Sequence, residues 1–234
     1  MRECIILAGG FGTRLQSVVN DVPKCMAEVA GKPFLEHLFH YIEGQNIDHV
    51  ILSLGYMADV VIGWLENVKT SYNFKISYVV ENKPLGTGGA IKLAFEEVSA
   101  EYAFIINGDT FFDVNMASLM GAFEKSKADV LIALKPLSDF DRYGSVQLDN
   151  SMRIIQFEEK KYIKEGLING GVYLVSGNIF SKLDLPENFS FEKDIMEAHL
   201  KDLYIYGSIQ DTYFIDIGIP SDFEKANNDF KHGK

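Results

Sequence analysis

The stretch CIILAGGFGTRL, residues 4–15, decides the fold class. Residues 4–8 form a short apolar run, which is the pattern of a buried β-strand. A glycine-rich segment follows at once and is incompatible with continued regular structure. A strand that runs directly into such a loop offers backbone N–H groups to a phosphate-sized anion.

Outward from this unit, the first half of the chain alternates between strand and helix patterns. Strands are expected at residues 49–54, 75–80 and 102–107, and helices near 34–45, 58–68 and from a Thr87 cap to about 98. The second half shows more strands, at 129–134, 144–148, 153–157, 167–175, 203–207 and 213–215, with helices near 191–200 and 221–230. This order predicts an α/β fold with a Rossmann-like, mixed but mostly parallel central sheet and helices on both faces.

The chain has 234 residues, of which 47% are hydrophobic, so it is long enough for one large core. We therefore expect a single domain, residues 1–234. The net charge of −11 argues against a nucleic-acid or anionic-membrane partner, because either would require a basic face. No apolar run reaches the length of a signal-peptide core or a membrane span. Cys4 and Cys25 are not spaced as a disulfide or zinc framework, which favours a reducing, cytoplasmic location.

The glycine-rich loop carries Arg14, so a nest of N–H groups and a guanidinium stand together at a strand end, as suits a polyphosphate. It lacks both the third glycine of a dinucleotide fingerprint and the Gly-Lys-Ser/Thr of a P-loop. Lys24, held beside Pro23, has the charge needed to offset a transferring phosphate. Taken singly, these residues also fit a tight turn with a surface arginine and a solvated lysine.

Asp109 and Asp216 follow predicted strands and are the candidate ligands of Mg²⁺, which takes one or two carboxylates and fills its other positions with water and phosphate oxygens. Either acid alone fits a turn or strand-end residue. The five histidines have neither metal-ligand spacing nor a nucleophile partner, so we interpret them as packing or surface residues.

The sequence motifs together resemble the sugar-1-phosphate nucleotidyltransferases across essentially the whole chain. The resemblance rests on LAGGFGTRL (7–15), PK (23–24), PLGTGGA (84–90), NGD (107–109), FEEK (157–160), NGG (169–171) and IDIG (215–218), in that order. It implies a GT-A-like three-layer sandwich with a nucleotide-binding half at about 1–110 and a sugar-binding half at about 111–234. It also implies an Mg²⁺-dependent enzyme that joins a nucleoside triphosphate to a sugar 1-phosphate and releases pyrophosphate.

The same resemblance assigns roles to individual residues. Catalytic roles fall to Arg14, Lys24 and Lys160, and metal binding to Asp109 and Asp216. Nucleotide contacts fall to Leu7, Ala8, Gly9, Gly10, Gly12, Thr13, Arg14, Lys24, Glu81, Pro84, Gly86, Thr87 and Asp109. Sugar contacts fall to Gly144, Glu159, Lys160, Asn169 and Asp216. The run EEKK, residues 158–161, leaves the register of the Glu-Lys pair open by one position, and a solvated charge cluster is the alternative.

Glu81 bears on the choice of base. Thymidylyl and uridylyl relatives often carry Gln at this place, whereas guanylyl relatives carry Glu. A carboxylate accepts from both N1–H and the N2 amino group of guanine, but it is repelled by the carbonyl oxygens that flank the N–H of uracil or thymine. GTP is therefore the favoured nucleotide, with a strand-end acid in water as the alternative.

Within the family, four stretches look most like the D-glycero-α-D-manno-heptose 1-phosphate guanylyltransferases: DFDRYG (139–144), LINGG (167–171), FSFE (189–192) and FIDIGIP (214–220). That likeness implies GDP-heptose supply for bacterial surface polysaccharides. Guanylyl transfer to mannose 1-phosphate, and uridylyl or thymidylyl transfer to another hexose 1-phosphate, remain open, as does a non-catalytic nucleotide-sugar sensor. Cys25 departs from the proline that relatives commonly have after the lysine, which predicts a looser Lys24 loop. A homodimer is expected from the frequency of symmetric oligomers.

Overall fold

The computed structural model describes residues 1–10, 15, 19 and 21–234. Within them, the central sheet is formed by β1 (Glu3–Leu7), β4 (His49–Leu54), β5 (Lys75–Val80), β6 (Tyr102–Asn107), β8 (Val130–Phe140), β9 (Ser145–Leu148), β10 (Ile154–Glu158), β11 (Ile163–Ser176) and β12 (Ile205–Ile209). Smaller sheets pair β2 (Glu28–Val29) with β3 (Lys32–Pro33), and β7 (Thr110–Phe112) with β13 (Phe214–Asp216).

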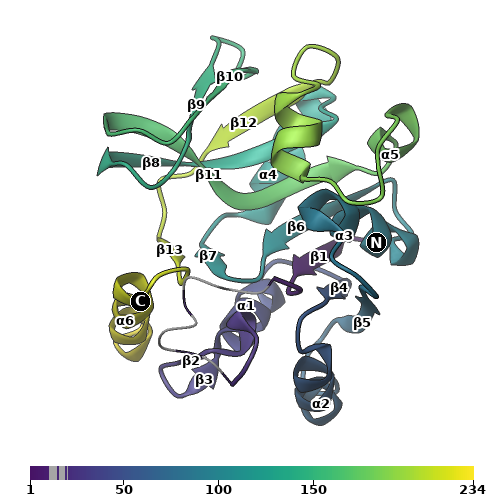
Figure 1. Ribbon diagram of the computed structural model, residues 1–234, viewed down its shortest axis with the longest axis vertical. Helices are drawn as coiled ribbons and strands as arrows, with labels where there is room; N and C mark the ends of the chain where they lie inside the picture. The colour runs from purple at the N-terminus through teal and green to yellow at the C-terminus, as the bar shows by residue number, and fades with distance from the viewer. Residues whose placement is uncertain (11–14, 16–18, 20) are drawn as a thin grey trace.

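The order of strands in the sheet separates a parallel part from a mixed part. β6, β1, β4 and β5 are adjacent and parallel, as the alternating pattern of the first half predicted. β11 continues the sheet antiparallel to β6, and it also pairs with β8 and β9. β12 adds to β8 in parallel, and β10 adds to β9 in antiparallel orientation. In Figure 1 these later strands form the upper part of the molecule.

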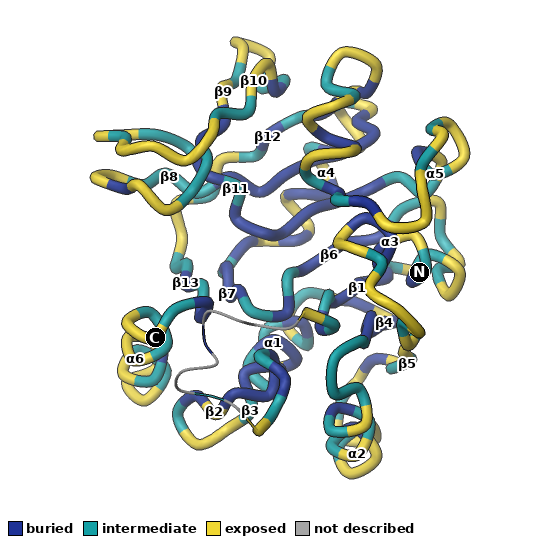
Figure 2. The backbone as a smooth tube through the Cα atoms, in the orientation of Figure 1, coloured by how far each residue is buried: buried dark blue, intermediate teal, exposed yellow. Residues whose placement is uncertain are grey.

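Helices cover both faces of the sheet. One core packs α1 (Phe34–Glu43), α2 (Ala58–Val68) and α4 (Met116–Ser126) against side chains such as Cys4 and Ile6. The other core packs α3 (Gly86–Ala94), α5 (Ile179–Lys182) and the π-helical segment η3 (Phe191–Glu197) against side chains such as Ile5. Consecutive residues of β1 thus enter opposite cores, because strand side chains alternate between faces. Figure 2 shows the central strands buried and parts of α2 and α6 (Pro220–Lys231) exposed. The predicted fold class is confirmed.

Some local predictions were wrong or incomplete. Thr87 does not cap α3, whose N-cap is Leu85; its hydroxyl bonds to η3 instead. The segment between residues 108 and 129 was left unassigned, yet it forms β7 and α4. The signal for α4 was present, because Asn115 is an N-cap residue whose Oδ1 accepts the Ser118 N–H at 2.8 Å. Short 3₁₀ turns, η1 (Lys24–Met26) and η2 (Phe95–Glu97), complete the described elements.

Candidate active site

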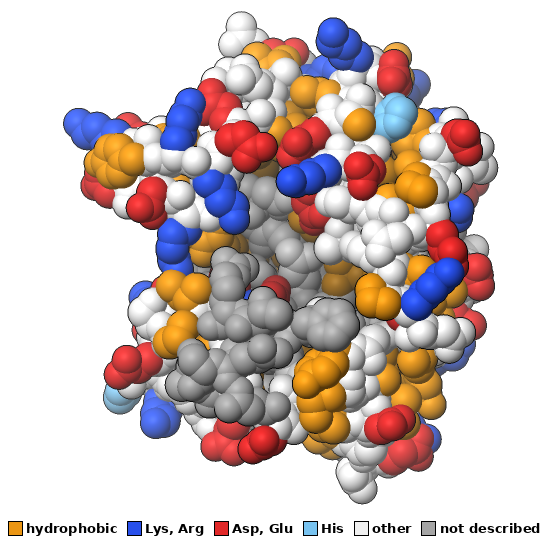
Figure 3. Space-filling model, viewed as in Figure 1, with side chains coloured by type: hydrophobic (Ala, Val, Ile, Leu, Met, Phe, Trp, Pro, Cys, Tyr) orange, Lys and Arg blue, Asp and Glu red, His pale blue; other side chains and the backbone are white. Residues whose placement is uncertain are grey.

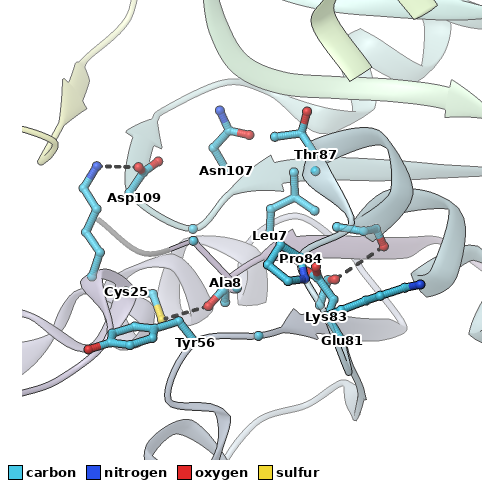
Figure 4. A pocket seen from close by; sticks show the side chains of 18 of the residues that line it. Leu7, Ala8, Cys25, Tyr56, Glu81, Lys83, Pro84, Thr87, Asn107 and Asp109 are labelled. Carbon is cyan, nitrogen blue, oxygen red and sulfur yellow. Dashed lines mark hydrogen bonds and ion pairs between the residues drawn. The ribbon is translucent and has the colours of Figure 1, made fainter. Parts of the chain in front are cut away.

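A cavity of about 620 Å³ opens at the carboxyl ends of the parallel strands. This is the edge where ligands bind in open α/β sheets. The cavity is lined by Leu7, Ala8, Gly9, Gly10, Lys24, Cys25, Ser53, Gly55, Tyr56, Glu81, Asn82, Lys83, Pro84, Gly86, Thr87, Ala90, Asn107, Gly108, Asp109 and Gly218. Figure 4 shows several of these side chains from close by, and the face viewed in Figure 3 is hollowed near its centre, with acidic and basic side chains around the hollow.

Backbone hydrogen bonds hold the strand ends together beneath the cavity. The Ala8 N–H donates to Ser53 O at 2.9 Å, and the Gly108 N–H donates to Leu7 O at 2.9 Å. A Cβ on Gly108 would lie 2.5 Å from Leu7 O, so this close approach requires glycine. The carboxyl ends of β1, β4 and β6 are therefore joined by hydrogen bonds beneath the cavity.

Gly9 brings the first loop against Glu81. A Cβ at Gly9 would lie 2.8 Å from Glu81 Oε1 and 3.0 Å from Gly55 N. The Tyr56 N–H also donates to Gly9 O at 3.2 Å. The glycine that the sequence assigned to phosphate binding thus also allows the loop to pass close to a carboxylate on the cavity wall.

The Glu81 carboxylate is half-buried and held at one oxygen. Its Oε2 accepts the backbone N–H of Leu85 at 3.0 Å. Burial raises the pKa of Glu81 above its ordinary 4.5, and the Leu85 hydrogen bond only partly opposes that rise. Removing a carboxylate from water favours its neutral form. The position of Glu81 in the cavity wall therefore sets its pKa.

Lys24 joins the two candidate metal ligands. Its ammonium forms an ion pair with Asp109 Oδ2 and lies 3.6 Å from Asp216 Oδ1. The Lys24 side chain is only 10% exposed, so the contact lies away from bulk water. Both carboxylates therefore reach one small region, although one lies in the turn after β6 and the other ends β13.

The neighbouring Cys25 is packed into the interior beside Lys24. Its side chain is buried, and Sγ lies 4.0 Å from the carbonyl oxygen of Ala8 as a weak donor. Burial, with Asp109 as a smaller cause, raises the pKa of the Cys25 thiol to about 12. The thiol stays protonated at neutral pH and packs the Lys24 turn against the end of β1.

A cation could be bound between the two aspartates. Among the described residues, no group of three or more His, Cys, Asp and Glu is placed to hold a metal ion. A metal at Asp109 and Asp216 would then take two carboxylate ligands and complete its shell with water or substrate oxygens. Such an oxygen-rich shell suits a hard divalent cation.

The predicted sugar contacts lie outside the cavity lining. Glu159 and Lys160 are exposed and follow the end of β10, so the alternation of faces expected for a strand does not extend to them. Glu158 instead accepts from Ser145 Oγ at 3.0 Å and pairs with Lys161 at 2.9 Å. These contacts do not decide the register of the Glu-Lys pair, which stays a prediction.

Gly144, Asn169 and Asp216 also lie outside that lining. A Cβ on Gly144 would lie 2.5 Å from Glu158 O, so Gly144 permits a close approach of the chain to β10. Asn169 Oδ1 accepts the Gly171 N–H at 2.9 Å, next to a shift in the pairing of β11 with β8. Their roles toward a sugar remain predictions.

The predicted nucleotide contacts lie closer together than the predicted sugar contacts. The structure brings together Leu7, Ala8, Gly9, Gly10, Lys24, Glu81, Pro84, Gly86, Thr87 and Asp109 in one lining. Gly12, Thr13 and Arg14 lie outside the described residues. Sequence reasoning missed Ser53, Gly55 and Tyr56, although their position just after a parallel strand was a usable signal.

Comparison with known proteins defines the class. Residues 3–233 match the family model described as nucleotidyl transferase, so the chain belongs to that family and is a nucleotidyltransferase. Enzymes of this family generally use a divalent metal ion. None of the helices in the described part of the chain combines the length and apolar character needed to cross a membrane.

Individual proteins of known description are similar to this chain over nearly its whole length. The chain is 46% identical to D-glycero-alpha-D-manno-heptose 1-phosphate guanylyltransferase of Aneurinibacillus thermoaerophilus, covering 98% of this chain and 99% of the relative. It is 45% identical to the protein of the same description from Campylobacter jejuni, covering 94% and 96%. The crystal structure of HddC from Yersinia pseudotuberculosis complexed with GMP-PN is 38% identical, with a TM-score of 0.88, covering 99% of this chain and all of that one.

Proposed function

We propose that the protein transfers GMP from GTP to D-glycero-α-D-manno-heptose 1-phosphate, giving GDP-heptose and pyrophosphate, with Mg²⁺ as the metal. The observation that carries the proposal is the convergence of Lys24, Asp109 and Asp216 at the edge of a cavity whose wall holds Glu81. The two guanylyltransferase relatives, which align over nearly their full lengths, support the choice of substrates.

Glu81 supports guanine as the base. When ionised, its two oxygens accept from N1–H and the N2 amino group of guanine, whereas a uracil or thymine edge would place carbonyl oxygens against it. The Leu85 N–H anchors Oε2 and so restricts the rotation of the carboxylate. An acid that is both positioned and partly desolvated discriminates more strongly than one in water.

The chemistry is an in-line displacement. An oxygen of the sugar phosphate attacks the α-phosphorus of GTP, and the bond from that phosphorus to the bridging oxygen breaks, so the electron pair leaves with pyrophosphate. The attacking phosphate is already ionised near neutral pH, so no general base is required. Catalysis then consists of positioning and charge stabilisation by Lys24, Arg14 and Lys160.

Asp109 and Asp216 would hold the Mg²⁺. When bound, the ion neutralises charge on the reacting phosphates. Lys24 is already at the two carboxylates in this structure, and a triphosphate offers its ammonium an alternative anionic partner. Gly9, Gly10 and Thr87 line the cavity and would contact the nucleotide. The family resemblance adds Gly12 and Thr13 to the nucleotide contacts, and assigns Gly144, Glu159 and Asn169 to the sugar.

Pyrophosphate release tests this proposal directly. GTP, UTP, dTTP, CTP and ATP would each be incubated with heptose, mannose or glucose 1-phosphate in the presence of Mg²⁺. We expect release that is at least tenfold faster with GTP and the heptose phosphate than with any other pair. Faster release with another nucleotide would reject Glu81 as the guanine reader, faster release with another sugar would reject heptose, and silence everywhere would favour a nucleotide-sugar sensor.

We further infer a cytoplasmic location and a homodimer. Cys4 and Cys25 are buried free thiols, which suits a reducing compartment. The dimer rests on the frequency of symmetric homo-oligomers alone. Light scattering coupled to size-exclusion chromatography would measure the mass of the particle against 26.3 kDa for one chain.

A further inference from the structure

A hydrogen-bonded chain connects the nucleotide cavity to the sugar-side strand β11 through Glu192. Thr87, which lines the cavity, donates from Oγ1 to Glu192 Oε2 at 2.7 Å. Tyr173 donates from its hydroxyl to Glu192 Oε1 at 3.4 Å and accepts from Asn169 Nδ2 at 2.9 Å. Oε2 also accepts from Ser190 Oγ at 3.1 Å. The carboxylate thus links a nucleotide-side hydroxyl to a sugar-side amide through one tyrosine.

Each hydrogen bond of this chain has one consistent donor and acceptor, and from both ends the donors point toward Glu192. The Phe191 N–H donates to Thr87 Oγ1 at 2.9 Å, which leaves the hydroxyl proton of Thr87 for Glu192. Burial, with the Glu192 carboxylate as a smaller cause, raises the pKa of Tyr173 well above its ordinary value, so its hydroxyl keeps its proton. Asn169 Oδ1 is already engaged by the Gly171 N–H, so its amino group faces Tyr173. Reversing any member would leave two donors or two acceptors facing each other.

Tyr173 is the deeply buried member of the chain. Tyr173 is 1% exposed, and its ring packs edge-on against Phe191 with centroids 5.5 Å apart. Glu192 lies in η3, a π-helical segment, and π-helical turns are rare and occur frequently at functional sites. Gly171 has φ +71° beside the pairing shift of β11, so the backbone at Asn169 also departs from a regular strand. Both elements that carry the linked side chains therefore depart from regular backbone.

We propose that Glu192 is a positioning residue that fixes the orientation of Asn169, through Tyr173, relative to Thr87 on the nucleotide side. The role rests on the proposed function, because it supposes that Asn169 contacts the sugar phosphate. Glu192 itself acts through its neighbours. Its loss should therefore raise the KM for the sugar phosphate while the chemical step, carried by other groups, is largely kept.

The kinetic test uses Glu192→Gln, Tyr173→Phe and the double variant. Gln offers one acceptor and one donor in place of two acceptors, so a hydroxyl donor loses its partner. We expect each single variant to raise the KM for the sugar phosphate about tenfold, the size expected for one lost oriented hydrogen bond, with kcat within about threefold of the parent. The double variant should be no worse than the more affected single one, because both break the same chain.

Glu197→Gln is the matched control, since it makes the same chemical change at an exposed residue of η3 outside the chain. It should leave both constants unchanged. Equal losses with Glu197→Gln, a fully additive double variant, or a normal KM in Tyr173→Phe would each overturn the proposal. Thermal denaturation of every variant identifies a KM change that merely follows from a loss of fold.

A second readout does not depend on turnover. The side-chain amide signal of Asn169 in ¹H–¹⁵N NMR spectra, assigned with Asn169→Asp, should move in both Glu192→Gln and Tyr173→Phe and stay in Glu197→Gln. An unmoved signal in Glu192→Gln overturns the inference whichever substrates the protein uses. If the parent enzyme prefers another substrate pair, the proposed function fails, and the kinetic series is judged with the preferred pair.

Discussion

The ammonium of Lys24 lies 3.6 Å from Oδ1 of Asp216, although one residue follows the first loop and the other ends β13 near the carboxyl terminus. Asp109, in the turn between β6 and β7, completes the ion-paired set. While Lys24 is present, its positive charge offsets the electrostatic repulsion between the two carboxylates. The same two groups repel each other when it is absent, so Lys24 controls how strongly this site attracts another cation.

Lys24→Met should increase the attraction of Asp109 and Asp216 for a divalent cation. The change keeps an unbranched side chain but removes the charge, so we expect kcat to fall about 10²- to 10³-fold, as for loss of a charge-stabilising donor. Without nucleotide, Mg²⁺ should raise the melting temperature of the variant more than that of the parent, because the aspartates then lack their internal cation. Equal Mg²⁺ shifts in differential scanning fluorimetry would show that Lys24 does not compete with the metal.

Asp109→Ala should abolish turnover and leave a folded protein, because Asp109 is partly exposed and packs no core. A drop of kcat by more than about 10³-fold is expected if it holds the metal that neutralises the phosphates. Chelation of the parent with EDTA should produce a similar loss, reversed by Mg²⁺, while Asp109→Ala stays inactive at any Mg²⁺ concentration. Near-normal pyrophosphate release by the variant would remove Asp109 from the mechanism.

Glu81 should make the KM for GTP rise at acidic pH. Burial raises the pKa of Glu81 above 4.5, and only the ionised form accepts from guanine, so binding is complete above the raised pKa and is lost as pH falls through it. Glu81→Gln should raise the KM for GTP about 10- to 100-fold at pH 8, because a hydrogen bond to a charged group is removed. The ratio of variant to parent KM should shrink toward pH 5, and dividing the two profiles cancels titration of the substrates. A ratio independent of pH would contradict this role.

Glu3 should make stability sensitive to acid. Its buried carboxylate contacts His49 Nδ1 at 3.0 Å and accepts the N–H groups of Ser99 and Ala100 at 2.7 Å each. Burial alone would raise the pKa of Glu3, but these contacts outweigh it and lower the pKa below 4.5. A lowered folded-state pKa means that the stabilisation is present above the unfolded-state pKa and is lost as pH falls through the folded-state value.

Glu3→Gln should therefore lower the free energy of unfolding by about 1–3 kcal/mol at pH 7, with a smaller difference below about pH 4.5. Urea denaturation at several pH values would measure the loss of stability at pH 7 and its decrease at low pH. Glu66→Gln, at an exposed residue paired with Lys69, serves as the control and should change stability by less than about 0.5 kcal/mol. A constant gap from pH 7 to pH 3.5 would contradict the linkage.

The amino-acid sequence alone determined the parallel half of the sheet. β4, β5 and β6 occupy the residues that the sequence predicted, because each is bounded by clear turn or helix signals. β4 and β6 are also largely buried, whereas β5 lies at the edge of the sheet and is partly exposed. The order of the motifs also indicated the nucleotidyl transferase family, which the match over residues 3–233 confirms. Helix starts were less certain, as Thr87 shows, since its hydroxyl is used by a partner from η3 instead of its own helix.

Only the tertiary structure decided which polar groups pair. Lys24 meets Asp109 and Asp216 because β13 pairs with β7, where Asp216 lies opposite Thr110, the residue after Asp109. Glu192 meets Thr87 and Tyr173 because η3 packs on α3. Local patterns specify faces and ends of elements, whereas these partners depend on packing between segments distant in sequence, which no spacing along the chain encodes.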